Sequence, residues 1–144
     1  MDIVEILGFL TWGASMSLDP EGIRIRIPGR PDLVVRTLVL DYTGTLSRDG
    51  ILMEGVEDLL RTLSEHLCIL VATADTFGKA RSQLVGNGRN DIEMIRSAAF
   101  SAAILGPEGC YGALIAEARI VCRVIRDCLD LFLKPLRATA TLRE

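Results

Sequence analysis

The chain has 144 residues, of which 49% are hydrophobic and 24% are charged, and its formal net charge at pH 7 is −3. This length fits one domain, and the apolar content is enough for a buried core, so we expect a folded protein rather than a disordered chain. The acidic balance and the aromatic content of 5% argue against nucleic-acid binding, which needs clustered Lys and Arg or aromatic rings that stack on bases.

The cysteines and the N-terminal residues indicate the cellular compartment of the protein. The cysteines, which form no metal-ligand spacing and no CxxC pair, are Cys68, Cys110, Cys122 and Cys128. We expect reduced thiols and a cytoplasmic protein. Ile3–Leu10 is too short to cross a bilayer and lacks the basic residues that open a signal peptide, so no membrane partner is predicted. Residues 1–20 are expected to form an N-terminal extension, and residues 21–144 a single domain.

The first predicted elements are a strand pair and a buried strand. Ile23–Ile27 alternates isoleucine with arginine, which is typical of a half-solvated strand, and Leu33–Val35 is its predicted return strand. Thr37–Leu40 then runs without alternation into Asp41. Such a run is typical of a strand that is buried on both faces of a parallel sheet.

A strand–helix–strand unit follows. Gly55–Glu65 carries apolar residues at helical spacing, and Leu67–Val71 is a second buried strand. A further helix is predicted from near Asp91, and a further strand over Ala102–Leu105. The last predicted elements are a helix over 112–118, a strand over Ile120–Ile125 and a helix over Asp127–Leu133 that stops at Pro135. The alternation predicts an α/β fold with a parallel sheet of about five strands.

Three polar segments follow directly on predicted strands. Asp41–Thr45 follows the first buried strand, Thr73 follows the second, and Gly86–Asp91 leads into a helix. The carboxyl ends of parallel strands meet at one edge of a sheet, so these segments are expected to converge on one site. A carboxylate followed by a glycine-containing turn, whose N–H groups can face phosphoryl oxygens, suits nucleophilic attack on phosphorus.

These segments resemble the motifs of one enzyme family. Asp41-Tyr42-Thr43-Gly44-Thr45 resembles the phosphorylation motif of the haloacid dehalogenase (HAD) superfamily, in the Thr-containing form of P-type ATPases. Thr73-Ala74-Asp75 resembles the second motif of the family, and Gly86–Asp91 resembles its acidic GDGxND loop. The three motifs occur in the family's order. The resemblance implies a three-layer, Rossmann-like sheet without a cap domain.

The resemblance also implies a reaction and its residues. Asp41 would attack a small phosphorylated substrate, and the aspartyl-phosphate would then be hydrolysed with the help of Mg²⁺. The implied metal ligands are Asp41, the main-chain carbonyl of Thr43, Asn87 and Asp91. The implied phosphate-binding residues are Gly44, Thr73, Ala74 and Asn90. The predicted function is that of a Mg²⁺-dependent phosphatase. A soluble ATPase is the less favoured alternative, because the chain has no Walker loop.

The sequence departs from the family pattern in three places. Thr43 stands where most phosphatases of the family have a second Asp, which acts as general acid and base. Asn87 stands where the P-type pattern has Asp. Only residues 74–85 separate Thr73 from Gly86, so one strand–helix unit, with its phosphate-binding lysine, is missing. Lys79 is the first candidate to replace that lysine in catalysis, and Arg81 and Arg89 are the others.

These departures leave a second function open. A catalytically impaired relative would keep the fold and bind phosphate or a partner protein. The missing unit would also expose an edge of the sheet, and exposed edges invite pairing between copies. A homo-oligomer is therefore a further prediction.

Overall fold

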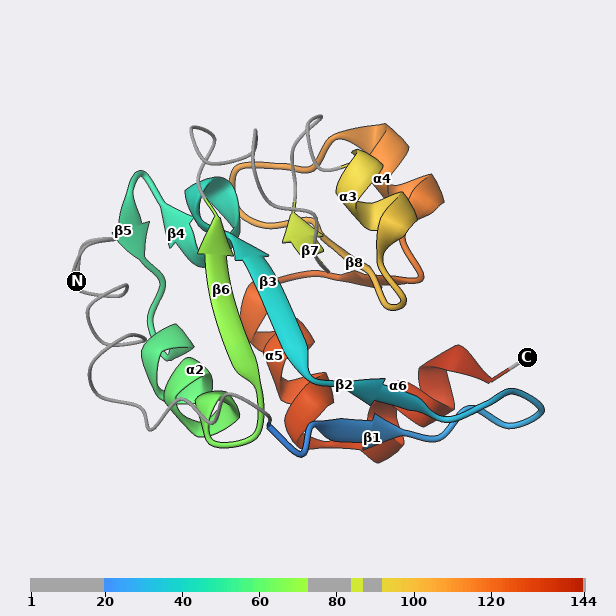
Figure 1. The fold of residues 1–144 in the computed structure, drawn as a ribbon. Coiled ribbons are helices and arrows are strands. Elements are labelled where there is room, and N and C mark those ends of the chain that lie inside the picture. Colours follow the sequence, from blue (N-terminus) through green and yellow to red (C-terminus); the bar gives the residue numbers. More distant parts are fainter. Residues whose placement is uncertain (1–19, 73–83, 87–91, 144) are drawn as a thin grey trace.

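A five-stranded parallel sheet forms the centre of the computed structural model (Figure 1). The structure describes residues 20–72, 84–86 and 92–143. The strands, in sheet order, are β6 (Cys68–Ala72), β3 (Thr37–Asp41), β7 (Leu84–Gly86), β8 (Ala102–Ile104) and β9 (Ile120–Cys122). The predicted α/β class and the parallel pairing are therefore confirmed.

Strand β3 lies between the two strands that precede the other predicted motifs. It pairs with β6 along its whole length, and Asp41 lies opposite Ala72. On its other side Leu40 lies opposite Val85 of β7. The chain thus passes from β3 outward to β6, and then returns to the far side of β3 to form β7, β8 and β9.

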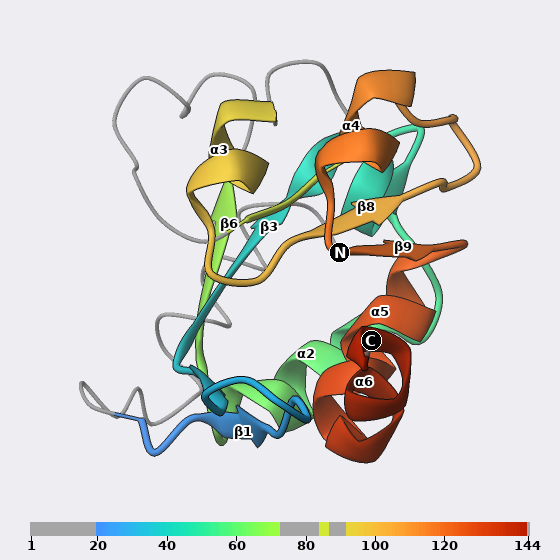
Figure 2. The same cartoon turned by 90° about the vertical axis from the view of Figure 1, so that its right-hand side faces the viewer.

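Helices cover both faces of this sheet (Figure 2). On one face, α2 (Val56–Ser64) and α5 (Ile125–Leu133) share a hydrophobic core with β3, β6, β8 and β9. On the other face, Ile95 of α3 (Ile92–Ser97) and Leu114 of α4 (Gly112–Glu117) pack with Ala103. This division is the one expected of right-handed crossovers. The connection through α2 runs from β3 to β6, and those through α3 and α4 run the other way along the sheet, so they cross its opposite face.

The core between α2 and α5 is apolar and closely packed. The stripe predicted over Gly55–Glu65 places Val56, Leu60 and Leu63 against the sheet, all three at most 2% exposed. Phe132 of α5 meets Phe100 edge to face, with 5.3 Å between ring centroids. Aromatic pairs prefer this geometry because the positive ring edge faces the negative ring face.

A small antiparallel hairpin precedes the sheet. It consists of β1 (Ile23–Ile25) and β2 (Leu33–Val35), as predicted, and helix α6 (Pro135–Leu142) packs against β1. Helix α6 corrects the prediction that the helical region stops at Pro135. Proline has no N–H to donate, but the first turn of a helix needs none, so Pro135 begins α6 instead of ending the helical region.

Strand β9 and helix α5 also differ from their predicted limits. The strand predicted to reach Ile125 ends at Cys122, and Ile125 instead opens α5, where it is fully buried. Apolar runs of this length do not separate strand from helix by periodicity alone.

Asp130 joins α5 to α6 by accepting hydrogen bonds from Lys134 and Arg137, each at 2.7 Å. The bond from Lys134, followed by the charges of Lys134 and Arg137, lowers the pKa of Asp130. A carboxyl group with a pKa lower in the folded state stabilises the fold above its unfolded pKa, and this contribution disappears as the pH falls through the folded pKa. We expect Asp130→Asn to reduce the free energy of unfolding by roughly 0.5–1 kcal/mol at pH 7.

Urea denaturation of both proteins at pH 7 and at pH 2.5 measures this effect. The difference between them should shrink as the pH falls, because the contribution of the ionised Asp130 carboxylate is lost. A difference that does not change with pH would mean that the charge of Asp130 does not link the two helices.

Three predictions concern the N-terminus, the 74–85 connection and the outer edge of β6. Residues 1–19 and 73–83 lie outside the described residues, so the N-terminal extension and the form of the 74–85 connection stay predictions. Among the described strands, β6 pairs only with β3, and self-association through its outer edge is likewise still a prediction. In the described part of the chain, no helix has the length and apolar character needed to span a bilayer.

Candidate functional site

The candidate site lies at the carboxyl end of β3, where Asp41 ends the strand. Asp41 is only 6% exposed, in a strand whose preceding residues Leu38–Leu40 are all buried. An aspartate is rarely this buried unless its carboxylate has partners. The position at the end of a central strand is the one that the sequence predicted for a nucleophile.

Thr45 is one partner of Asp41. Its side chain is fully buried, and its hydroxyl donates a hydrogen bond to Oδ2 of Asp41 at 3.3 Å. Thr45 was part of the predicted motif but was not predicted as a site residue. The spacing of the motif could have identified Thr45, because a turn over the five residues Asp41–Thr45 brings the side chain of Thr45 back over that of Asp41.

The turn between them, Tyr42–Leu46, needs a glycine. Gly44 has a φ of 74°, in the left-handed region, which glycine adopts without the steric cost that other residues carry. The turn is closed by Ser47, whose Oγ donates to the carbonyl oxygen of Tyr42 at 3.0 Å. Gly44 is buried within the turn, whereas Thr43 is exposed. Thr43 therefore faces outward from the turn.

A two-stranded hairpin stands next to this turn. It pairs β4 (Ser47–Arg48) with β5 (Ile51–Leu52) through the residues Asp49 and Gly50, which have φ values of 52° and 79°. Two successive left-handed residues are typical of a tight hairpin turn. The hairpin was not predicted, although Asp-Gly between two short strands is a known signal for one.

The hairpin is attached to the site on two sides. The hydroxyl of Tyr42 donates to the carbonyl oxygen of Gly50 at 3.0 Å, and the N–H of Asp49 donates to Oε1 of Glu108 at 2.8 Å. Glu108 belongs to the loop after β8. In the same loop, a Cβ added to Gly106 would lie 3.2 Å from the carbonyl oxygen of Gly44. The loops after β3 and β8 therefore meet and form one side of the site.

Three of the predicted site residues are described, and they come together. Asp41, Thr43 and Gly44 lie in one turn at the end of β3. The predicted site residues that lie outside the described residues are Thr73, Ala74, Lys79, Asn87, Asn90 and Asp91. The strands that precede them flank β3 and are described up to Ala72 and Gly86. The roles of these six residues stay predictions.

The donors at Asp41 suit magnesium. A carboxylate and a main-chain carbonyl, as predicted for Asp41 and Thr43, are the hard oxygen ligands that Mg²⁺ prefers. Among the described residues no group of three or more His, Cys, Asp or Glu side chains lies close enough to hold a metal ion. The other predicted ligands, Asn87 and Asp91, lie outside that part of the chain.

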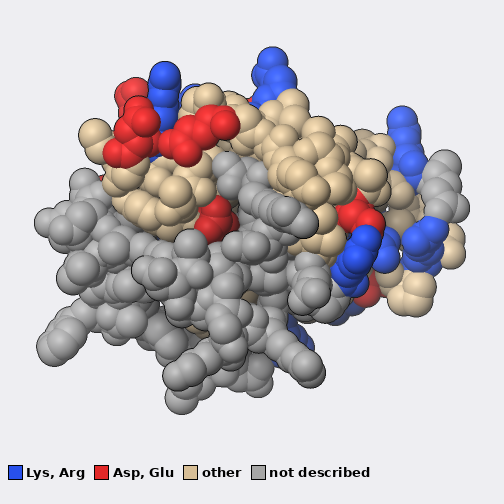
Figure 3. Space-filling view, turned by 90° about the horizontal axis from the view of Figure 1, so that it is seen from above, with Lys and Arg blue, Asp and Glu red and all other residues tan. Residues whose placement is uncertain are grey.

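The charge on this face bears on substrate binding. In the described part of the surface, Figure 3 shows acidic side chains gathered toward one side of the face seen from above, and basic side chains mostly at its rim. An anionic substrate needs positive charge near the attacking carboxylate. We expect a bound metal ion, together with Lys79 or its arginine neighbours, to supply it.

Replacing Thr45 by valine tests its contact with Asp41. Valine keeps the shape of threonine but removes the hydroxyl, so the carboxylate loses one donor. We expect the free energy of unfolding to fall by roughly 1–3 kcal/mol, the usual cost of removing one partner of a buried polar pair. Urea denaturation measures this. Thr45→Ser keeps the hydroxyl and serves as the control; an equal loss in both variants would assign the effect to packing instead of the hydrogen bond.

Comparison with known proteins gives limited guidance. No protein-family model matches the chain. An uncharacterized protein of Methanocaldococcus jannaschii is 37% identical over 60 residues, which are 42% of this chain and 64% of that protein. The chain thus covers less than two thirds of this relative's length. The name of this relative carries no activity.

Proposed function

We propose that the protein is a Mg²⁺-dependent phosphohydrolase that forms an aspartyl-phosphate on Asp41. The observation that carries the proposal is a buried carboxylate at the carboxyl end of the central strand, held by the hydroxyl of Thr45 at 3.3 Å. A nucleophile has to be held in one orientation for attack, because misplacement by even about 1 Å can be costly in rate.

The strand order supports this placement. Because β6 is added on one side of β3 and β7, β8 and β9 on the other, the order of strand addition reverses next to Asp41. Ligands of open α/β sheets bind outside the carboxyl ends of the strands at such a reversal. We interpret the fold as the three-layer, Rossmann-like sheet of the HAD superfamily, without a cap and without the strand–helix unit that would lie beyond β6.

The proposed reaction has two steps. A carboxylate oxygen of Asp41 forms a bond to phosphorus while the bond from phosphorus to the alcohol oxygen breaks, and the alcohol takes up a proton from solvent. Water then attacks the phosphorus of the aspartyl-phosphate, which releases inorganic phosphate and restores the Asp41 carboxylate. Mg²⁺, when bound, would neutralise negative charge on the phosphoryl group.

The threonine side chain at position 43 limits which phosphate esters are hydrolysed quickly. It cannot supply the proton that an acid catalyst gives to a leaving alcohol, and such a group contributes typically about 10²–10⁴ in rate. Aryl phosphates, whose leaving groups need no proton, should therefore be hydrolysed much faster than alkyl phosphates. We expect the ratio of kcat/KM for p-nitrophenyl phosphate over a simple alkyl phosphate to be at least about 10².

A colorimetric assay with p-nitrophenyl phosphate tests the proposal. Phosphate release should require Mg²⁺ and stop when EDTA is added. Thr43→Asp, which restores the acid at this position, should narrow the difference between aryl and alkyl phosphates. Release that is unaffected by EDTA, or equal rates for both kinds of ester, would contradict this mechanism.

A phosphate-binding module without turnover is the second candidate. One observation favours it: β6 ends at Ala72 and β7 begins at Leu84, so only residues 73–83 connect them across β3. A parallel crossover usually takes about a dozen residues or more. This function predicts that the protein binds phosphate analogues but releases no phosphate from esters. In either case we propose a small phosphorylated ligand in the cytoplasm.

A further inference from the structure

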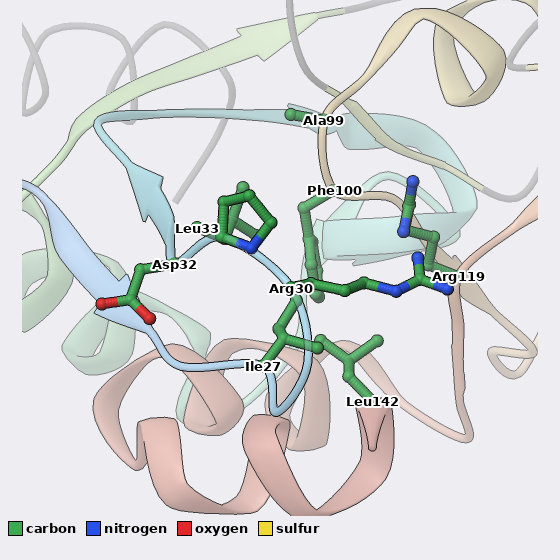
Figure 4. A pocket seen from close by; sticks show the side chains of 9 residues that line it. Ile27, Arg30, Asp32, Leu33, Ala99, Phe100, Arg119 and Leu142 are labelled. Carbon is green, nitrogen blue, oxygen red and sulfur yellow. The ribbon is translucent and has the colours of Figure 1, made fainter. Parts of the chain in front are cut away.

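A pocket of about 290 Å³ lies between the β1–β2 loop, the residues before β8 and the end of α6 (Figure 4). Its walls come from the loop between β1 and β2, from the segments that precede β8 and β9, and from the end of α6. Because all strands of the sheet are parallel, the residues before β8 and β9 mark its amino end, whereas Asp41 lies at its carboxyl end. The pocket therefore cannot be part of the proposed phosphoryl-transfer site.

Two arginines from separate segments line this pocket. Arg30 follows a tight turn in which its own N–H donates to the carbonyl oxygen of Ile27 at 3.1 Å. Arg119 precedes β9, and its N–H donates to the hydroxyl of Ser101 at 3.2 Å. Both main chains are thus held in place. Figure 4 shows the two side chains extending toward the same side of the pocket.

The acidic residue of the pocket lies away from the two guanidinium groups (Figure 4). Asp32 also lines the pocket, but its carboxylate pairs with Arg24 at 3.2 Å. Figure 4 shows that carboxylate at the other side of the pocket from the ends of Arg30 and Arg119. An anion placed between two guanidinium groups is attracted by both of them.

Apart from the two arginines and Asp32, the residues that line the pocket are apolar. Phe100 is 5% exposed and is held edge to face by Phe132. Ile27, Leu33 and Leu142 complete the apolar surface and are partly buried against the main core. A pocket with a charged side and an apolar side suits a ligand with an anionic head and a hydrophobic body. Its volume is at the lower end of the range for small-molecule sites, so the body has to be compact.

We propose that this pocket is a second ligand site, which binds a compact organic phosphate monoester. A phosphate monoester carries close to two negative charges at neutral pH and matches two guanidinium groups, whereas a carboxylate carries one. Guanidinium groups bind phosphate through paired N–H donors. Each guanidinium group has five N–H donors, so Arg30 can donate to a ligand while it keeps its other contacts. The apolar body of the ligand lies against Phe100.

Calorimetric titration with phenyl phosphate tests this proposal. The titration uses the full chain with Asp41→Ala and EDTA, so that no ester is hydrolysed, and the Arg119 variants separate binding in this pocket from binding at the proposed catalytic site. We expect saturable binding, weakened at least tenfold by Arg119→Met and partly restored by Arg119→Lys. Arg123→Met, a change of an exposed arginine away from the pocket, should leave the affinity unchanged. Inorganic phosphate and benzoate should both bind more weakly than phenyl phosphate, because each lacks one half of the ligand.

Three outcomes would overturn the proposal. One is the absence of saturable binding at millimolar phenyl phosphate. Another is equal affinity in the Arg119→Met protein, provided that its melting temperature shows that it is folded; if it is not, Arg30→Met is used in its place. The third is tighter binding of benzoate, which would mean that the pocket does not select phosphate. Because Asp41 is absent throughout, none of these results depends on the proposed phosphohydrolase activity.

Discussion

Replacement of Asp41 by asparagine will reduce the kcat/KM for p-nitrophenyl phosphate by at least about 10³-fold. Asparagine keeps the size of the side chain and can still accept the hydrogen bond from Thr45, but its amide is not a nucleophile. The loss should therefore appear as lost turnover in a protein that remains folded. Steady-state kinetics with Mg²⁺ present, together with a melting curve for each protein, separates the two effects.

A matched control comes from α2. Asp58 is exposed on that helix, away from the end of β3, and Asp58→Asn removes the same charge. Its kcat/KM should stay within about twofold of the wild-type value. If Asp41→Asn kept wild-type activity, the phosphoryl group would have to be accepted elsewhere and the proposed mechanism would be wrong.

Replacement of Phe132 by alanine will produce the largest loss of stability that we expect from a single core substitution. Phe132 is 1% exposed and fills the space between α5 and the sheet, in contact with Phe100. Truncation of a buried phenylalanine removes its transfer free energy and leaves a cavity, at a cost of roughly 3–5 kcal/mol. Because domains of this size are stable by only about 5–15 kcal/mol, this is a large share of the total.

Urea denaturation of wild type and the Phe132→Ala variant measures this cost. Leu136→Ala is the control, since Leu136 is 82% exposed and its change should stay within about 0.5 kcal/mol. Phe132→Leu should fall between the two, because it leaves a smaller cavity. A cost below about 1 kcal/mol for Phe132→Ala would mean that α5 does not pack on the sheet as described.

The strands of the sheet were predictable because their signal is simple. Apolar runs such as Thr37–Leu40 and Leu67–Val71 identified β3 and β6, but burial on both faces was predicted for both, whereas β6 lies at the edge of the described sheet and its Leu70 is 44% exposed. The β4–β5 hairpin was missed because its strands have two residues each, and periodicity needs longer segments. Helix α6 was missed because proline was interpreted as a stop, although it is also a common first residue.

The candidate site was predictable only in its local part. The motif Asp41–Thr45 identified the turn, but the hydrogen bond from Thr45 depends on how that turn folds back on itself. The contact of Asp49 with Glu108 joins residues 59 positions apart, and no local pattern contains it. The arginine pocket was not predicted for the same reason, because Arg30 and Arg119 come together only through the packing of the hairpin against the end of the sheet.

A thermal-shift titration with Mg²⁺ and beryllium fluoride tests the central claim most directly. Beryllium fluoride mimics the phosphoryl group on an aspartate and needs no knowledge of the substrate. At about 100 times its dissociation constant a ligand adds roughly 2.7 kcal/mol to stability, which is a rise of roughly 5–10 °C for a chain of this size. We predict this rise for wild type only when both reagents are present, and none for Asp41→Ala. No rise in the melting temperature of wild type, or the same rise in Asp41→Ala, would contradict a phosphoryl-accepting site at Asp41.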